Sequence, residues 1–277
     1  MDTVFQALIM GIVQGLTEFL PVSSSGHLIL VPYLFGWDDP FITSLAFSVM
    51  LHIGTLVALL AYFRDDWLRL IPAGLAAIRH RSFGADPDRK LAWLLVAATI
   101  PAAVVGFLLS DVLETQIRQP GLVAVTMVVG GLILLVADRI GGQSRSVDDV
   151  TFPVATGIGA AQALALIPGI SRSGISISAG RFAGLDRAAA ARFAFLMATP
   201  ITAGAIVFEA RKLLTGEAGV VVATMPLVVG LVASLVSGFA AIHFMLRYLR
   251  TRSLQVFVWY RFVLVAVVVV VLSSRGG

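Results

Sequence analysis

The residues with the clearest chemistry lie between Gln14 and His27. Gln14 and Glu18 are four residues apart, so both lie on one face of a predicted helix. A carboxylate can act as a base or bind a divalent metal, and a histidine can exchange a proton near neutral pH. Next in the chain come Ser23, Ser24, Ser25 and Gly26. Their hydroxyls and flexible backbone can bind an anion at the start of a helix. This stretch therefore suits a phosphate group.

A second stretch carries the complementary charge. Arg172 is the only charged residue from Thr151 through Gly180, and its planar guanidinium suits phosphate oxygens. Phosphoryl transfer needs mainly positioning and charge stabilisation, and the two stretches together offer both. A structural alternative stays open, in which Glu18 and Arg172 form an ion pair that only stabilises the fold. The neighbours of Arg172 that complete an anion cradle are Ser171, Ser173, Gly174 and Ser176.

The elements that must position these residues are predicted to be membrane helices. The chain is 58% hydrophobic and only 13% charged, whereas soluble domains carry about 25% charged residues. It has no cysteine, which excludes disulfides, cysteine zinc sites and thiol nucleophiles. Its uninterrupted apolar spans are close to the ~20 residues that a bilayer crossing needs, and they cover 41–63, 91–110, 120–137, 187–208, 219–246 and 254–272.

Both chemical stretches lie in apolar segments that are broken, 3–35 and 151–180. Irregular backbone at membrane depth is tolerated only where protein or a wet cavity covers it, so each segment is predicted to be a re-entrant helix–loop–helix hairpin. Shifting the chain by 148 residues aligns the two segments without a gap. The identities pair Gly11 with Gly159, Gln14 with Gln162, Leu16 with Leu164, Ser23 with Ser171, Ser25 with Ser173, Gly26 with Gly174 and Ile29 with Ile177. We therefore predict one membrane domain, 1–277, made of repeat one (about 1–145) and repeat two (about 150–277).

Each repeat contains one hairpin and three spans, and three is an odd number, so the second copy should enter the membrane from the opposite side. Inverted repeats with broken helices place their site near the midplane. If the loop 64–90 is cytoplasmic, that side collects thirteen Lys and Arg residues against four on the other, and both termini lie outside the cytoplasm. The predicted fold is an all-α polytopic membrane protein with an inverted-topology repeat, six transmembrane helices and two re-entrant helix hairpins.

The two stretches resemble the signatures of a known family. Q-G-L-T-E-F-L-P-V-S-S-S-G-H (Gln14 to His27) resembles the first signature of the undecaprenyl-diphosphate phosphatases, the bacitracin-resistance family, and P-G-I-S-R-S-G (Pro168 to Gly174) resembles the second. The resemblance covers the whole chain, including the Tyr260-Arg261-Phe262 triplet. It implies hydrolysis of undecaprenyl diphosphate to undecaprenyl phosphate and inorganic phosphate, for recycling of the lipid carrier in peptidoglycan synthesis. It also implies a divalent cation (Mg²⁺ or Ca²⁺), a bacterial plasma-membrane location, a site facing the extracytoplasmic side, and bacitracin resistance on overproduction.

The resemblance also implies roles for single residues. Glu18 and Gln14 match the paired positions that would bind a metal, and many members have Glu where this chain has Gln14. Ser24 matches a proposed nucleophile and His27 a proposed nucleophile or acid, so Ser24, His27 and water all stay open as the nucleophile. Our hypothesis is that Glu18 deprotonates the attacking group, Arg172 and the serines hold the diphosphate, and the prenyl tail lies in an apolar groove.

The same sequence features also suit a second function. The runner-up is a polyprenyl-phosphate flippase or transporter, because broken helices in inverted repeats are typical of transporters. A pure carrier has no need of a carboxylate, serine and histidine beside its anion clamp. We interpret His52, near Thr55 in the span 41–63, as a residue of helix packing, and an approach to the site stays open as the alternative. The expected partners are a polyprenyl diphosphate lipid and membrane lipids, with no nucleic acid, and a homodimer stays open.

Overall fold

The computed structural model describes the chain except residues 1, 85, 110–118, 143, 215–222 and 276–277. Within the described part, six helices are long and apolar enough to cross a membrane, and they match the six predicted spans. The all-helical, polytopic architecture is therefore confirmed. These helices are α3 (Leu45–Tyr62), α5 (Pro87–Leu108), α7 (Pro120–Ile140), α10 (Arg187–Leu214), α11 (Thr224–Tyr248) and α12 (Gln255–Arg275).

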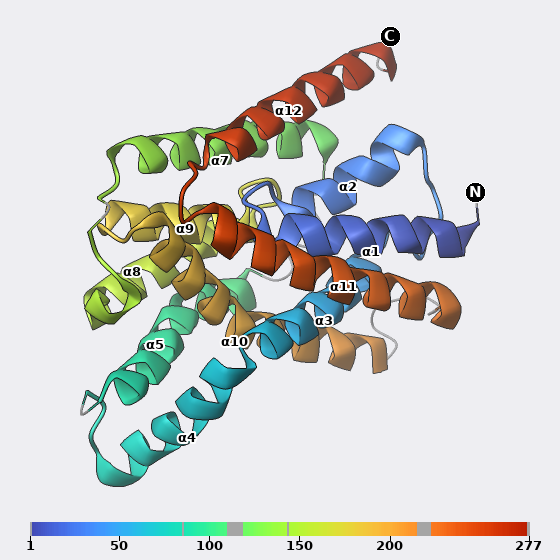
Figure 1. Cartoon of the computed structure of the whole chain (residues 1–277). Coiled ribbons are helices and arrows are strands. Elements are labelled where there is room, and N and C mark those ends of the chain that lie inside the picture. The colour runs from blue at the N-terminus through green and yellow to red at the C-terminus, as the bar shows by residue number, and fades with distance from the viewer. Residues whose placement is uncertain (1, 85, 110–118, 143, 215–222, 276–277) are drawn as a thin grey trace.

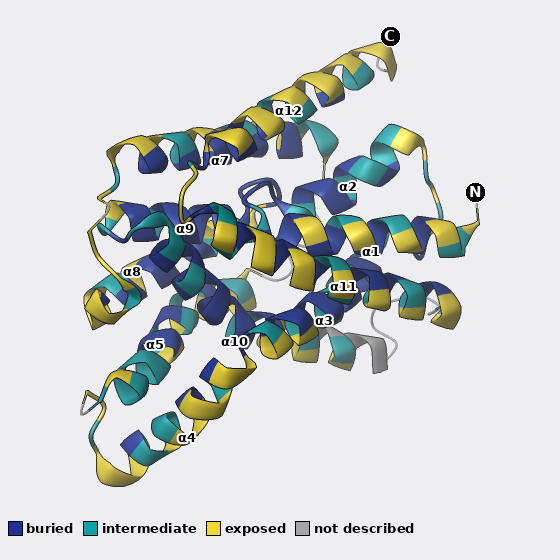
Figure 2. Cartoon of the chain, in the orientation of Figure 1, coloured by how far each residue is buried: buried dark blue, intermediate teal, exposed yellow. Residues whose placement is uncertain are grey.

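The two broken segments form helix–loop–helix hairpins. The first consists of α1 (Thr3–Phe19) and α2 (Ser24–Phe35). The second consists of α8 (Phe152–Gln162), the 3₁₀ helix η2 (Ala163–Leu166) and α9 (Arg172–Phe182), and a short 3₁₀ helix η1 (Val147–Asp149) precedes it. The hairpins come from opposite ends of the molecule, and their loops meet near its middle (Figure 1). Residues 21–23 and 168–171 of these loops are buried (Figure 2). The inverted-topology relation of the two halves stays a prediction.

Small residues hold the first hairpin against α11. A Cβ atom on Gly11 would overlap the carbonyl of Gly230, and one on Gly15 would overlap the backbone at Gly238. In lipid the hydrophobic effect does not drive helices together. Van der Waals contact between closely approaching backbones is therefore a main source of their packing energy. Because α1 lies in close contact with α11, its C-terminal turn, which carries Glu18, ends in the protein interior.

The segment 64–90 was expected to be a loop, but most of it is a helix, α4 (Arg64–His80). Asp66 in its first turn accepts from Arg69 at 2.8 Å and from Arg192 of α10 at 2.7 Å. A carboxylate at this position also complements the helix dipole. Leu68 and Leu75 face outward along the helix, so α4 is amphipathic. The spans had a clear apolar signal, whereas this helix depends on its amphipathic pattern and its ion pairs.

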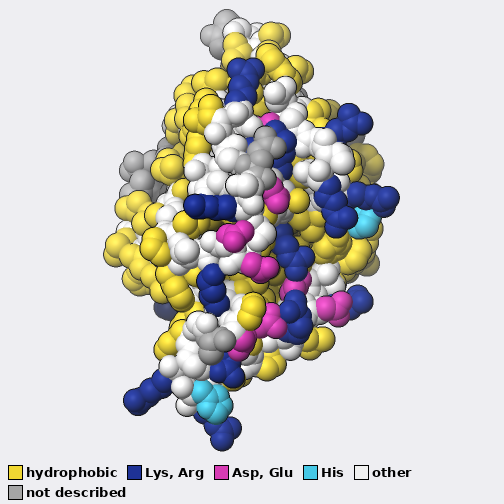
Figure 3. Space-filling view, turned by 60° about the vertical axis from the view of Figure 1, so that its left-hand side comes forward, with side chains coloured by type: hydrophobic (Ala, Val, Ile, Leu, Met, Phe, Trp, Pro, Cys, Tyr) yellow, Lys and Arg dark blue, Asp and Glu magenta, His cyan; other side chains and the backbone are white. Residues whose placement is uncertain are grey.

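Charged residues gather at one end of the molecule. Figure 3 shows Lys, Arg, Asp and Glu side chains on the face that lies to the left in Figure 1, with hydrophobic flanks around them. Both termini lie toward the opposite end (Figure 1). At the charged end, Arg187 donates to Asp138 at 2.5 Å and Arg181 donates to the carbonyl of Gly141 at 2.9 Å. These bonds join the ends of α7, α9 and α10.

Candidate active site

The two hairpin loops have the same local geometry. Ser23 and Ser171 both adopt left-handed backbone conformations, with φ of 75° and 79°. Each is the N-cap of the helix that follows, and each hydroxyl accepts the backbone N–H of the residue three positions on, Gly26 at 3.2 Å and Gly174 at 3.1 Å. Side-chain acceptors of this kind satisfy the free N–H groups of a helix start. The equal geometry agrees with the sequence repeat.

The loops are also bonded to each other. The backbone N–H of Gly169 donates to the Ser23 hydroxyl at 3.1 Å, and the Ser173 hydroxyl donates to the carbonyl of Leu20 at 3.1 Å. Arg261 of α12 is fully buried and bridges both loops, because its guanidinium donates to the carbonyls of Pro21 (2.7 Å) and Ile170 (3.2 Å). Since each bond joins one loop to the other, the two helix starts are fixed relative to each other.

The structure brings Glu18 and Arg172 into direct contact. The Nη2 atom of Arg172 pairs with Oε1 of Glu18, whose side chain is only 4% exposed. The Nη1 atom of Arg172 donates to the hydroxyl of Thr202 on α10 at 2.6 Å. A guanidinium held at two nitrogens has a defined direction, which is what a clamp for phosphate oxygens requires.

The second oxygen of Glu18 is surrounded by donors. Ser24 donates to Oε2 at 2.5 Å and Gln14 donates to it at 3.0 Å. His52 of α3 places its Nε2 atom 3.4 Å from the same oxygen. The short bond from Ser24 directs the hydroxyl proton onto a carboxylate, which is the arrangement of a nucleophile and its base.

A cavity of about 160 Å³ lies beside these groups. Its polar lining consists of Glu18, Ser24, Ser25, His52, Gln162 and Arg172. Small and aliphatic side chains of α5, η2 and α10 form the rest of its wall. The cavity therefore joins the acid and hydroxyl of the first hairpin to the guanidinium of the second.

Other predicted site residues lie behind the cavity wall. His27 is buried at 4% exposure, with Nδ1 2.7 Å from the carbonyl oxygen of Ser23 and Nε2 2.8 Å from the hydroxyl of Tyr260. Its two nitrogens therefore already have protein partners. The hydroxyl of Ser176 is buried and has no hydrogen-bond partner in the described part of the chain. The capping and linking residues of the loops, which support the site from behind, are Ser23, Gly26, Ser171, Ser173 and Gly174.

Sequence reasoning missed three residues at or next to the cavity. His52 was interpreted as a packing residue, yet it lines the cavity next to Glu18. Gln162 also lines it, and its alignment with Gln14 in the repeat was the available signal. Thr202 fixes Arg172 from a helix that is distant in sequence, and no local pattern pointed to it.

Among the described residues, the side chains around the cavity offer few oxygen ligands to a divalent cation. No group of three or more His, Asp or Glu residues with metal-binding geometry occurs among the described residues. Both oxygens of Glu18 are paired with donors. Gln14 turns its amide nitrogen toward Glu18, and its buried amide oxygen has no hydrogen-bond partner in the described part of the chain. Divalent cations such as Mg²⁺ and Ca²⁺ prefer several oxygen ligands, whereas Glu18 and Gln14 offer one carboxylate that is already paired and one unpartnered amide oxygen.

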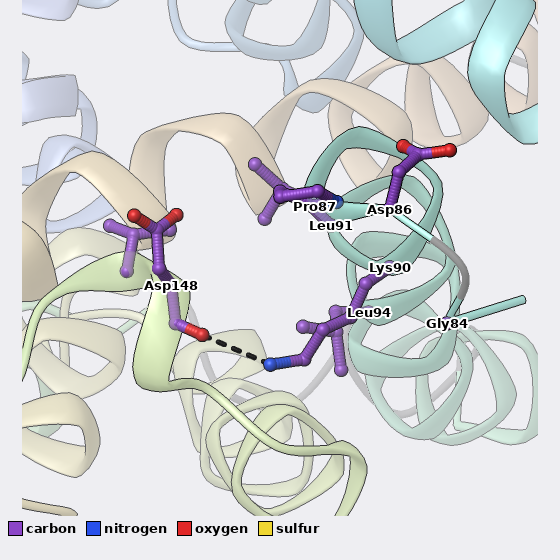
Figure 4. A pocket seen from close by; sticks show the side chains of 8 residues that line it. Gly84, Asp86, Pro87, Lys90, Leu91, Leu94 and Asp148 are labelled. Carbon is purple, nitrogen blue, oxygen red and sulfur yellow. Dashed lines mark hydrogen bonds between the residues drawn. The ribbon is translucent and has the colours of Figure 1, made fainter.

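Two further cavities differ in character. An apolar groove of about 370 Å³ continues from the first cavity between α5 and α10, and the two share Ala102, Leu166, Ile201 and Ala205. A separate pocket of about 230 Å³ lies at the start of α5, where Lys90 donates to the carbonyl of Asp148 at 3.0 Å (Figure 4). That pocket shares no lining residue with the cavity at Glu18.

Comparison with known proteins shows similarity over nearly the whole chain. The family model described as Bacitracin resistance protein BacA matches residues 7–267. The undecaprenyl-diphosphatase of Desulforudis audaxviator is 47% identical over 98% of this chain and 99% of its own length. Those of Gemmatimonas aurantiaca and Rubrobacter xylanophilus are each 46% identical, over 99% and 96% of this chain and 99% and 97% of their own lengths.

Proposed function

The chain belongs to the family of the bacitracin resistance protein BacA, and from that premise we propose that it is an undecaprenyl-diphosphatase. It hydrolyses the phosphoanhydride bond of undecaprenyl diphosphate and yields undecaprenyl phosphate and inorganic phosphate. The observation that carries the proposal is the contact of Glu18 with both Arg172 and Ser24 at the wall of one cavity. A base, a hydroxyl and an anion clamp meet there.

In this mechanism Ser24 is the nucleophile. Its oxygen attacks the terminal phosphorus while Glu18 takes the hydroxyl proton across the 2.5 Å bond. The bond from that phosphorus to the bridging oxygen breaks, and undecaprenyl phosphate leaves. Water then attacks the phosphoserine and the bond from phosphorus to the Ser24 oxygen breaks. Glu18 returns its proton to that oxygen, and inorganic phosphate leaves with the oxygen and both protons of the water. Dividing the reaction into two steps is the usual gain of a covalent nucleophile.

Arg172 supplies the electrostatic part of catalysis. Charge spreads over the equatorial oxygens of the transferred phosphoryl group, and a guanidinium held in place by Thr202 stabilises it. His27 acts here as a positioning residue, because its bonds to Ser23 and Tyr260 hold the loop that carries Ser24. This role replaces direct proton transfer by His27, since both ring nitrogens are engaged away from the cavity.

The apolar groove suits the prenyl tail. It adjoins the cavity at Leu166 and Ile201 and continues along α5 and α10 as far as Phe107 and Phe208. The lining is apolar apart from Thr99 and backbone, as an isoprenoid chain requires. Because the groove leads away from the start of α10 at Arg187, the headgroup is at the cavity while the tail extends toward the less charged end.

We infer the orientation of the protein in its membrane from the distribution of charged residues. The chain is a multi-pass membrane protein. We place it in the bacterial plasma membrane with its charged end in the cytoplasm, in accordance with the positive-inside rule. The groove then extends toward the extracytoplasmic side. A divalent cation would neutralise charge on the diphosphate, and the protein oxygens that would hold it belong to Glu18, which is already paired, and Gln14.

The test is phosphate release by purified protein in detergent, where no transport gradient exists. We expect Ser24→Ala, Glu18→Gln and Arg172→Ala each to lower kcat by about 100-fold or more. Substrate labelled in its terminal phosphate should leave a label on Ser24 after acid quenching. Ser274→Ala, near the C-terminus and far along α12, is the matched control and should keep full activity.

Two outcomes would contradict the proposal. If wild-type protein releases no phosphate yet moves polyprenyl phosphate across vesicles, it is a flippase. If Ser24→Ala keeps normal turnover and no label is trapped, Ser24 is not the nucleophile and water attacks the phosphorus directly.

A further inference from the structure

Gln162 is a buried amide without a protein partner. It is the last residue of α8 and is only 2% exposed, and it lines the cavity beside Glu18 and Arg172. Neither its amide oxygen nor its amide nitrogen finds a hydrogen-bond partner in the described part of the chain. Buried polar groups are nearly always hydrogen-bonded, so each exception calls for a ligand, a water or a functional reason.

The repeat explains why this amide is left over. Gln162 aligns with Gln14, whose nitrogen donates to Glu18 at 3.0 Å. The residue that aligns with Glu18 under the same shift of 148 is Leu166. The second repeat has therefore kept the glutamine and has no carboxylate for it to bind. An amide nitrogen without a protein acceptor is free to donate to an anion in the cavity.

His52 presents a second donor from another helix. Its Nδ1 atom lies 2.8 Å from the carbonyl oxygen of Ser48, and a carbonyl can only accept, so Nδ1 carries a proton and this bond fixes the ring. The Nε2 atom is then a donor only when the ring is an imidazolium. The Nε2 edge then points to the cavity, 3.4 Å from Glu18. The packing of α3 on α11 uses other residues, such as Gly54, which lies against the α11 backbone. His52 is thus oriented by its own helix and faces Glu18 and the cavity.

The cavity needs more donors than Arg172 supplies. A diphosphate carries at least two negative charges, whereas Arg172 is already paired with Glu18 and bonded to Thr202. Among the described lining residues, only Arg172 and His52 can carry a positive charge. The helices that pack on α3 beside His52 add no further cation. In α10 from 193 to 208 and α11 from 224 to 242 there is no Asp, Glu, Lys, Arg or His, and α1 contributes only the carboxylate of Glu18.

We propose that Gln162 and His52 are substrate-binding residues, in which the Gln162 amide and the His52 imidazolium donate hydrogen bonds to the diphosphate and complete the set begun by Arg172. The proposal rests on the proposed function, since it names further contacts of the same headgroup. It assigns to the second repeat a polar contact besides Arg172, and to α3 a role in the site.

The test uses Gln162→Leu and His52→Leu with a polyprenyl diphosphate whose bridging oxygen is replaced by methylene. Each variant should bind this analogue about 10- to 100-fold more weakly, which is the effect of losing a hydrogen bond to a charged group. Without ligand, Gln162→Leu should unfold at a higher temperature, by roughly 2–4 °C, because an unpaired amide leaves the interior. Loss of affinity together with a gain of stability is the signature of a binding residue.

Matched controls exist in the chain. Gln6→Leu removes another buried glutamine, on α1 and outside the cavity lining, and His243→Leu removes a histidine that lies beside Tyr62. Both should bind the analogue like wild type. His52→Gln keeps a donor without the imidazole and should recover most of the affinity that His52→Leu loses.

Three results would overturn the inference. Gln162→Leu and His52→Leu could bind the analogue as Gln6→Leu does. Gln162→Leu could lose stability and affinity together, which would make its role structural. His52→Gln could bind as weakly as His52→Leu, which would exclude a simple donor. Failure of the proposed function is distinguishable, because wild-type protein would then bind the analogue without releasing phosphate from the true substrate.

Discussion

Each oxygen of the Glu18 carboxylate has its own partners, because Arg172 contacts Oε1 while Ser24 and Gln14 donate to Oε2. A buried ion pair is a weak source of stability, yet removing one partner leaves a buried charge at a cost of about 3–5 kcal/mol. Charge-removing variants of Glu18 therefore mix catalysis and folding. Neutral neighbours of the pair give cleaner tests of how the site works.

Thr202 is such a neighbour. Thr202→Val keeps the shape of the side chain but removes the acceptor for Arg172, which lies 2.6 Å away. We expect kcat/KM to fall by about 10-fold, because a hydrogen bond to a charged group contributes about 1.5–3 kcal/mol and water restores part of it. Phosphate-release kinetics of Thr202→Val and Thr202→Ser provide the measurement. Thr202→Ser should restore activity, and equal activity of all three proteins would show that Thr202 does not position Arg172.

Gln14 offers a prediction about metal dependence. Gln14→Glu would place a second carboxylate within about 3 Å of Glu18, where the amide now donates. Two such carboxylates repel each other, and a divalent cation relieves the repulsion by binding between them. We expect phosphate release by Gln14→Glu to be more sensitive to EDTA than that of wild type, and to recover on addition of Mg²⁺ or Ca²⁺. Identical EDTA titrations of the two proteins would rule out a cation at this position.

At the scale of elements, the two hairpins depend on their loops. Ser23 and Ser171 hold equivalent strained positions and cap equivalent helices, but their hydroxyls differ in one respect. The hydroxyl of Ser23 also accepts the N–H of Gly169 in the other loop. The link between the hairpins is therefore asymmetric, with Ser23 as its centre.

This asymmetry predicts different costs for the same substitution. Ser23→Ala leaves the N–H groups of Gly26 and Gly169 without their acceptor, whereas Ser171→Ala leaves only that of Gly174. We expect Ser171→Ala to cost about 1 kcal/mol, as cap removal does, and Ser23→Ala about 2 kcal/mol. Thermal unfolding in one detergent compares them. A smaller effect of Ser23→Ala than of Ser171→Ala would contradict the asymmetry.

At the scale of the whole molecule, the hairpins approach from opposite ends and the charged residues gather at one of those ends (Figures 1 and 3). Positive loops are retained in the cytoplasm. The count of Lys and Arg on the two sides orients the first span. It also orients the other spans, since the described spans alternate in direction along the chain (Figure 1). One measurement of sidedness at each end therefore tests the arrangement.

The chain has no cysteine, so single cysteines can report sidedness without background. Asp38 and Arg81 are both exposed, and they lie between α2 and α3 and just after α4. In intact cells a membrane-impermeant thiol reagent should label Asp38→Cys and leave Arg81→Cys unlabelled until the membrane is opened. The opposite pattern would place the cavity groove on the cytoplasmic side.

Much of the fold and the central pair of the site could be predicted from the sequence, because the lipid bilayer restricts which residues and which backbone conformations can cross it. Apolar length determined the six spans, and the breaks at Pro21 and Pro168 located the two hairpins. Isolated ionisable residues in apolar surroundings are costly, so Glu18 and Arg172 were visible as a functional pair. The amphipathic helix α4 was missed, because its apolar residues recur along one helix face and do not form a continuous apolar run.

Only the tertiary structure decided which side chains surround the pair of Glu18 and Arg172. His27 lies next to Ser24 in the broader motif, yet its ring turns to Tyr260, while His52, Gln162 and Thr202 reach the cavity region from three other helices. Local spacing determines which face of a helix a residue occupies, but not which helix that face meets. Contacts between helices that are distant in sequence depend on packing of the whole chain, and here small residues on α1 and α11 and the joined loops set that packing.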